Sequence, residues 1–361
     1  MVDRYDLPLV NSVLHPTDFS KASQQAFAHA LAIALIRKTS LTILHAGGNR
    51  SKSWDSFPSV RTTLERWGML EAGSPRSAVF DQLAVRVKKV ISKEKNPLAA
   101  CLGYLEDHAI DLIVLATGGR QGLRRWLKGS AAENIAQRSE TMTLFVPDGG
   151  RGFVSAGSGR LTLSRILVPI AHTPSPQPAV QFAARMARVA GGDVGVTLLH
   201  VGDAANVPEV HIPEDSAVEW TSEVRQGEAP DEIVAEADRS SANLIVMTTD
   251  GRDVLIDALR GSHTERVIRR GPCPVLAVPA SWAEEYLSGR PLGDVVSEER
   301  RRERKVLKKT FRQAAQSLHP DRASDEDDRA HLTDLMARAN RAYEKGDRVE
   351  IERIRRERER G

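Results

Sequence analysis

Cysteine and long apolar runs are both scarce in this 361-residue sequence. The two cysteines, Cys101 and Cys273, lie in no CxxC or other metal-ligand spacing, so we expect both thiols to be reduced, buried and structural. No stretch approaches the roughly 18 uncharged apolar residues that a membrane-spanning helix needs, and the N-terminus lacks the pattern of a signal peptide. These absences predict a cytoplasmic protein without a membrane partner.

Catalytic motifs are absent as well. The sequence contains no G-x-S-x-G elbow, no HExxH and no P-loop lysine. The ten histidines are scattered, and we expect His45 and His200, at equivalent strand ends, to be hydrogen-bonded structural groups. The sequence therefore nominates no catalytic base and no metal site.

Length and charge divide the chain. It exceeds the size that one hydrophobic core usually supports, which predicts two or three domains. The net charge is +3, from 51 Lys and Arg against 48 Asp and Glu. Residues 298–361 hold 19 of the Lys and Arg and 15 of the Asp and Glu. The tail thus carries +4 and the first 297 residues −1, so we expect the tail to be a different kind of segment.

The part of the chain before the tail contains an internal repeat. In each copy an apolar run ends in a proline and short polar residues, an alanine-rich helical pattern follows, and further apolar runs come later. The paired segments are 11–20 with 164–173, 41–46 with 196–201, 110–117 with 242–249, and 142–147 with 273–279. Continuous apolar runs between amphipathic helices are typical of parallel strands covered on both faces. We therefore predict an α/β fold with two doubly wound, five-stranded, Rossmann-like parallel sheets.

Two segments fall outside this pattern. Residues 148–159 are glycine-rich and aperiodic, which predicts a plain linker between the copies. Residues 47–75 hold Trp54, Trp67 and several serines, and we expect a loop and one helix there.

Both copies share a glycine spacing after their fourth predicted strand. The residues are Gly119, Gly129 and Ser130 in the first copy and Gly251, Gly261 and Ser262 in the second. Glycine lets the backbone approach a ligand closely, and a helix that begins after Gly-Ser would direct free N–H groups at phosphate oxygens. The same spacing also fits two tight turns without any ligand.

With these motifs the sequence resembles the universal stress protein (UspA) family, over roughly residues 8–147 and 162–279. The resemblance implies a fold like that of the adenine nucleotide alpha hydrolases and a bound ATP or other adenine nucleotide, with Mg²⁺ as a candidate companion ion. It also implies that Asp18 holds the adenosine half and that the backbone at Ala46 meets adenine. The nucleotide-binding residues that the resemblance assigns are Pro16, Thr17, Asp18, Ala46, Ala116, Gly119, Arg120, Gly129 and Ser130.

The second copy departs from the family pattern. Ala171 stands where the family has aspartate, Thr248 replaces the first glycine, and the charge of Asp250 would oppose a phosphate. We expect a degenerate second site in a domain that packs against the first. The prediction for the whole protein is a binding and signalling role, with slow ATP hydrolysis at most.

The tail predicts two helices that form an antiparallel hairpin. It resembles helices two and three of a J-domain, with the signature tripeptide His319-Pro320-Asp321 between them. Residues 283–296 match the usual first helix poorly, so the resemblance implies docking to a DnaK-type chaperone rather than stimulation of its ATPase. The docking residues would be Lys309, Arg312, His319, Pro320, Asp321 and Arg322.

The alternative is a scaffold that binds no nucleotide and contacts nucleic acid through its basic helix. Residues 300–312 hold eight basic residues against one acidic residue. The predicted division is 1–147 and 162–280 for the two stress-protein domains, 148–161 and 281–297 for linkers, and 298–361 for the J-like segment. The sequence leaves open whether the whole chain forms a homodimer.

Overall fold

The computed structural model describes residues 10–47, 54, 57–117, 141–191, 193–213, 218–249, 263–280, 310–311, 313–318, 325–344 and 348–360. The first half of the fold contains β1 (Ser12–Thr17), α1 (Lys21–Arg37), β2 (Ser40–Ala46), α2 (Val60–Arg66), α3 (Ala78–Asp81), β3 (Arg86–Ser92), α4 (Pro97–Asp107), β4 (Leu112–Ala116) and β5 (Met142–Val146). The second half contains β6 (Arg165–Ile170), α7 (Gln177–Ala190), β7 (Val194–Val201), the short helix η3 (Ala204–Asn206), β8 (Val218–Arg225), α8 (Ala229–Arg239), β9 (Leu244–Thr249), α9 (His263–Arg270) and β10 (Val275–Pro279).

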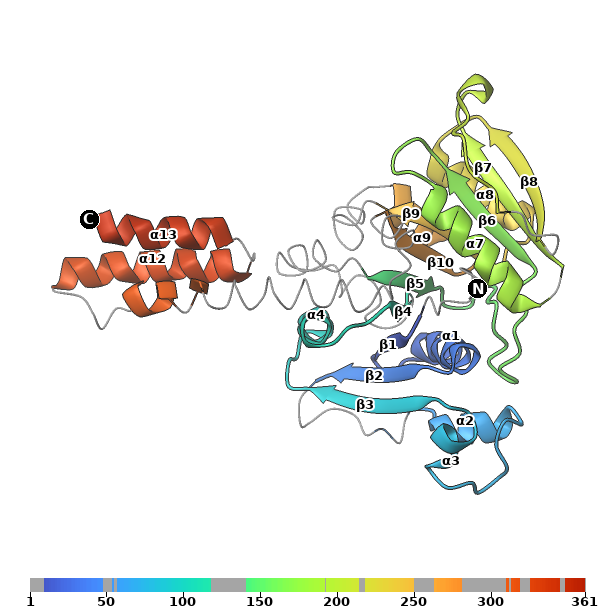
Figure 1. Ribbon diagram of the computed structural model, residues 1–361, viewed down its shortest axis with the longest axis horizontal. Coiled ribbons are helices and arrows are strands. Elements are labelled where there is room, and N and C mark those ends of the chain that lie inside the picture. Colours follow the sequence, from blue (N-terminus) through green and yellow to red (C-terminus); the bar gives the residue numbers. More distant parts are fainter. Residues whose placement is uncertain are drawn as a thin grey trace, which may run out of the picture.

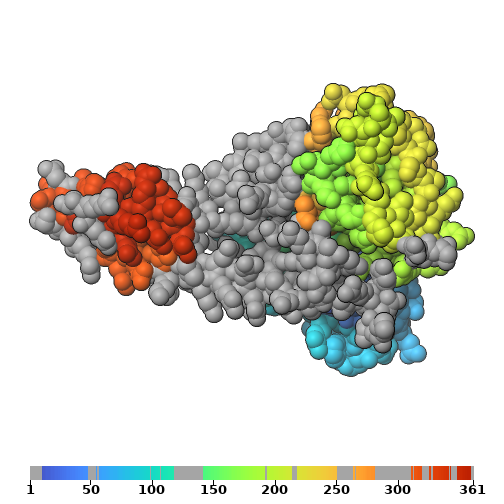
Figure 2. Space-filling model, turned by 45° about the horizontal axis from the view of Figure 1, so that its top comes forward, coloured from blue at the N-terminus to red at the C-terminus, as the bar shows by residue number. Residues whose placement is uncertain are grey.

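All ten strands belong to one sheet, in the order β3-β2-β1-β4-β5-β10-β9-β6-β7-β8 (Figure 1). Each half is a parallel five-stranded sheet, which confirms the predicted fold class. The halves meet where β5 and β10 pair antiparallel, with Leu144 opposite Leu276. The two predicted sheets therefore form one continuous sheet, and Figure 2 shows part of the first half (blue to cyan) beside the second half (green to yellow).

Helices cover both faces of the sheet. One apolar core lies under α1 and α7 and runs across both halves, and a second lies under α4, α8 and α9. Successive residues of β1 show the reason, because Val13 faces the first core and Leu14 the second, and both are fully buried. Cys101 and Cys273 lie in the second core as free thiols, and burial raises the pKa of each to about 12.

The segment between the halves is more than a plain linker. Val154 and Leu161 form an antiparallel bridge, and the Ser155 N–H donates to the Arg160 carbonyl at 3.0 Å, so the chain turns back in a small hairpin. Phe153 and Val154 are buried in the first core. Its glycines make tight turns and close approaches rather than a flexible tether.

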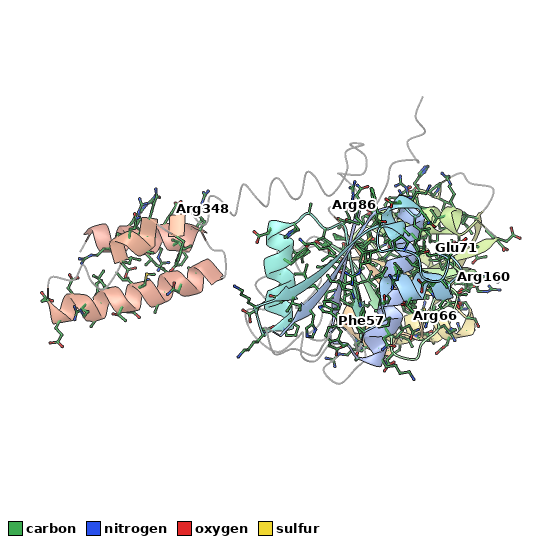
Figure 3. All side chains as sticks on the ribbon, turned by 90° about the horizontal axis from the view of Figure 1, so that it is seen from below. Phe57, Arg66, Glu71, Arg86, Arg160 and Arg348 are labelled. Carbon is green, nitrogen blue, oxygen red and sulfur yellow. The ribbon has the colours of Figure 1, made fainter. Side chains whose placement is uncertain are left out.

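This hairpin packs on α1 and on the region after α2. The ring of Phe153 meets His29 of α1 edge to face, with 4.7 Å between ring centroids. The Trp67 indole N–H donates to the Ala156 carbonyl at 3.0 Å, and Arg66 of α2 donates to the same oxygen at 3.2 Å. Figure 3 labels Arg66 in this region. The predicted loop and helix of residues 47–75 is confirmed where it is described, and its helix, α2, buries its apolar side against the hairpin.

The described part of the tail contains three helical segments rather than two. Residues 310–318, with position 312 outside the description, pack against α12 (Glu326–Glu344) and α13 (Arg348–Arg360) (Figure 1). Their shared core consists of Ala314, Leu318, Leu332, Leu335, Ala339, Ala342, Ile351 and Ile354. The expectation of a two-helix hairpin missed α13, which adds two isoleucines to this core and paired charges at its surface.

No helix in the described ranges is long and apolar enough to cross a membrane.

The contact between Gly159 and Trp67 gives a test of the hairpin. Gly159 has φ +69°, and a Cβ there would lie 2.3 Å from Cε3 of Trp67. We expect Gly159→Ala to lower the free energy of unfolding by about 2–4 kcal/mol, through strain and overpacking. Gly149→Ala is the matched control, because Gly149 has φ +74° but nothing within 4 Å of its added Cβ. Urea unfolding that shows equal losses for both variants would contradict the packing described here.

Candidate functional site

The strand order of each half places a topological switch point at its central strands. In the first half the chain winds outward from β1 toward β3 on one side and from β4 toward β5 on the other. Ligands of open α/β sheets bind at such a switch point, outside the carboxyl ends of the strands. In this half the switch point lies between β1 and β4.

The structure brings five of the predicted residues to this edge. Pro16 and Thr17 end β1, Asp18 follows them, Ala46 ends the neighbouring β2 and Ala116 ends β4. The other four, Gly119, Arg120, Gly129 and Ser130, lie outside the described residues, as do Gly251, Gly261 and Ser262 of the second half.

Asp18 is partly exposed at the start of α1. Its Oδ1 accepts a hydrogen bond from the Ser20 N–H at 2.9 Å, and the Ser20 side chain caps α1 by accepting from the Ser23 N–H at 3.2 Å. The described residues place no hydrogen bond on Oδ2. The turn thus fixes the carboxylate through one oxygen and leaves the other for a ligand.

Phe19, the next residue, has an unusual backbone. Its φ is +60°, a region that residues with a side chain rarely adopt. Its ring stacks on His45 at the end of β2, with 4.1 Å between centroids, and the Phe19 N–H donates to Thr17 Oγ1 at 3.1 Å. His45 itself donates from Nδ1 to the Thr17 carbonyl at 2.8 Å, as expected for a structural histidine.

Trp54 and Phe57 extend this aromatic group. Trp54 meets Phe19 edge to face at 5.1 Å, and the Lys89 ammonium lies 4.8 Å from the Trp54 ring centroid. Phe57, labelled in Figure 3, is buried against Phe19 at 5.6 Å. The sequence analysis gave Trp54 no role. The structure places it beside Phe19, the residue that follows Asp18.

At the equivalent edge of the second half, several side chains make hydrogen bonds to other residues of the same half. Thr248 accepts through Oγ1 a hydrogen bond from the Ala179 N–H in the first turn of α7 at 3.2 Å. Gln177 and His211 exchange two hydrogen bonds, at 2.7 and 2.9 Å. His172 lies 3.1 Å from the Asn206 carbonyl. Thr248, which replaces the first glycine of the motif, therefore contacts the first turn of α7 through its side chain.

His200 repeats the arrangement of His45. It ends β7 opposite Ile170, and its Nδ1 lies 3.4 Å from the Ile170 carbonyl. Both histidines make the hydrogen bond that was predicted, through Nδ1 to a backbone carbonyl of the neighbouring strand. Among the described residues no group of three or more His, Cys, Asp or Glu could hold a metal ion.

Comparison with known proteins identifies the family of this chain. The profile of the universal stress protein family matches residues 10–147 and 209–279, more than half of the chain. The chain belongs to the universal stress protein family.

Two universal stress proteins of Methanocaldococcus jannaschii are similar in sequence. One is 43% identical over 65 residues, which are 18% of this chain and 38% of that protein. The other is 23% identical over 158 residues, which are 38% of this chain and 95% of that protein. Among solved structures, a universal stress protein from Archaeoglobus fulgidus has a TM-score of 0.48 at 17% identity, over 75% of this chain and 99% of its own.

Two further solved members are described with nucleotides. A universal stress protein family protein from Arabidopsis thaliana has AMP bound, with a TM-score of 0.23, 17% identity, and coverage of 32% of this chain and 91% of that one. Another universal stress protein is in complex with cAMP, with a TM-score of 0.23, 23% identity, and coverage of 38% and 97%.

Beneath the Asp18 turn of this stress protein lies a buried row of polar side chains. His15 of β1 lies 3.0 Å from the Val114 carbonyl through Nδ1 and 3.3 Å from Ser23 Oγ through Nε2. Ser23 Oγ is 2.7 Å from Thr17 Oγ1. Burial lowers the pKa of His15 to about 4, and it does the same for His29 under the hairpin. Sequence reasoning missed this row, although a histidine within an apolar run was a visible signal.

These two histidines make stability depend on pH. At pH 7.5 they are neutral in both the folded and the unfolded chain. Below their ordinary pKa of 6.5 the unfolded chain binds protons and the folded chain does not, so stability falls as pH falls toward 4. We expect the free energy of unfolding to drop between pH 7.5 and 5 by about 2 kcal/mol for each histidine.

Urea unfolding at the two pH values measures this drop. His15→Val and His29→Leu should each remove about half of it, because neither replacement binds a proton in the unfolded chain. A pH dependence that survives in the double variant would show that other groups cause it.

Proposed function

We propose that the first half of this stress protein binds one adenine nucleotide, ATP in particular, at the edge of the sheet where Asp18, Ala46 and Ala116 lie. The observation that carries the proposal is the contrast between the halves. The first half presents a positioned carboxylate whose Oδ2 accepts no hydrogen bond from the described residues, whereas the second has Ala171 at that place and hydrogen bonds of its own across the edge.

Family membership supports the proposal, because other members have been solved with AMP or cAMP. In this scheme Asp18 Oδ2 accepts from a ribose hydroxyl, and the backbone at Ala46 meets the base. Gly119, Gly129, Ser130 and Arg120 would hold the phosphates, and Mg²⁺ would accompany a triphosphate. Nothing in the described site supplies a catalytic base, so we propose a binding and signalling role.

Isothermal titration with ATP, AMP and cAMP tests the site. We expect one nucleotide per chain, and a loss of about 10- to 100-fold in affinity for Asp18→Ala, because a charged hydrogen-bond acceptor is removed. Asp203→Ala is the matched control, since Asp203 accepts from the Ala205 N–H at 2.9 Å in the same local geometry, after β7. Equal losses from Asp203→Ala, or a strong loss from Gly261→Val alone, would place the site in the second half.

We also propose that the tail docks a DnaK-type chaperone through His319-Pro320-Asp321. The supporting observation is that the flanking helices pack on each other, through Ala314 and Leu318 on one side and Leu332 and Leu335 on the other. α13 strengthens this small unit, because Arg358 makes two hydrogen bonds to Asp328 of α12 at 2.7 and 3.2 Å. The tripeptide itself lies outside the described residues, between these helices in sequence.

Chaperone binding and single-turnover ATPase assays test the docking proposal. His319→Gln should abolish binding, whereas His331→Gln, an exposed histidine on α12, should leave it unchanged. Lys309, Arg312 and Arg322 would steer the encounter, so association should slow as salt rises. Binding that persists in His319→Gln and falls only with salt would favour the nucleic-acid alternative, a nonspecific polyanion contact of residues 300–312.

A further inference from the structure

The buried row under the Asp18 turn has a single consistent direction of hydrogen bonding. The Phe19 N–H can only donate, so it donates to Thr17 Oγ1, and the Val114 carbonyl can only accept, so His15 donates to it from Nδ1. His15 Nε2 is then an acceptor for the Ser23 hydroxyl, and the Thr17 hydroxyl donates to Ser23. A neutral histidine satisfies every member of the row.

The second half shows that the fold does not need this row. Strand register makes the positions equivalent, because Thr17 pairs with His45 as Ile170 pairs with His200. The corresponding places in the second half are two residues of β6 and the residue that follows it. The polar residues His15, Thr17 and Asp18 correspond to Val168, Ile170 and Ala171. Val168 and Ile170 are buried in the core.

Apolar residues would therefore serve the sheet at least as well. A buried polar network contributes little net stability compared with apolar residues of the same shape. The chain contains both arrangements, a polar row and a pair of apolar residues, at equivalent strand positions. The polar row occurs in the half that has an aspartate after its first strand, and the apolar residues occur in the half that has alanine there.

The row ends on the residue that follows Asp18. Thr17 holds the N–H of Phe19, whose positive φ turns the chain between Thr17 and Ser20. His172, the counterpart of Phe19, is not among the described residues with positive φ. A backbone in this region persists only where its surroundings hold it.

We propose that His15, Ser23 and Thr17 are positioning residues that hold the Phe19 backbone and thereby aim the Asp18 carboxylate at the ligand. The row connects the middle of β4, at Val114, to the turn after β1, so it fixes Asp18 relative to both strands of the switch point. This inference rests on the proposed nucleotide site for its functional consequence. The other part of the inference, that the row holds the Phe19 backbone, does not depend on a bound ligand.

Two replacements of Thr17 give the sharpest test. Thr17→Val keeps the shape but removes the acceptor for the Phe19 N–H, and it approaches the Ile170 of the second half. Thr17→Ser keeps the hydroxyl. In ligand-free protein we expect amide hydrogen exchange of Phe19 to rise by about tenfold in Thr17→Val and to stay near wild type in Thr17→Ser.

Nucleotide titration of the same proteins completes the experiment. Affinity for ATP should fall by about tenfold in Thr17→Val and be restored in Thr17→Ser. Thr17→Val should also lower resistance to urea, because the buried Phe19 N–H loses its acceptor. A merely structural role predicts the same loss of stability but an unchanged affinity in the folded fraction. His15→Val should reproduce Thr17→Val more weakly, because it acts from the far end of the row.

The outcomes separate this inference from the proposed function. Wild-type protein that binds no adenine nucleotide overturns the proposed function, and the Phe19 exchange then decides the positioning role alone. Wild-type binding with equal affinity in Thr17→Val, or a Phe19 amide that stays protected in Thr17→Val, overturns the inference. Should Thr17→Val fail to fold, His15→Val measured by the same two readouts decides it.

Discussion

The antiparallel pairing of β5 with β10 is the contact on which the rest of the structure depends. Phe145, Leu144, Leu276 and Ala277 are all buried at this junction. Because the ladder is continuous there, neither half exposes the strand that would otherwise end its sheet. The two cores can therefore run across both halves, and the only free edges of the described sheet are β3 and β8.

Because the two halves share this sheet, the residues at their carboxyl-end edges can differ while the strand order stays the same. Strand order and register repeat in the two halves, so the halves can be compared position by position at their strand ends and in the segments that follow them. After β2, Trp54 and Phe57 pack beside Phe19. After β7, His172 and Gln177 make hydrogen bonds to the segment that follows the strand. Asp18 lies at this edge of the first half, whereas at the equivalent edge of the second half Thr248, Gln177 and His172 make hydrogen bonds within the half.

The sequence predicted those parts of the fold whose residues carry a local signal. Buried strands on both faces appear as apolar runs, and eight of the ten strands were found in this way. β3 and β8 were missed because edge strands are half exposed, and β3 carries Lys88 and Lys89 among its apolar residues. The hairpin of residues 148–161 was missed for another reason, since its order comes from Trp67 and His29, which lie far away in the sequence.

The candidate site shows the same division between local and distant causes. Asp18 and Ala46 were predictable because they occupy repeated places in a known family pattern, but the polar row beneath them depends on a bond from His15 to Val114, 99 residues away. A single copy of the pattern offers no means of telling a buried polar residue that serves the fold from one that serves a ligand. Two copies on one sheet allow the comparison, because the half with Val168 and Ile170 shows that apolar residues suffice at these places in the strand.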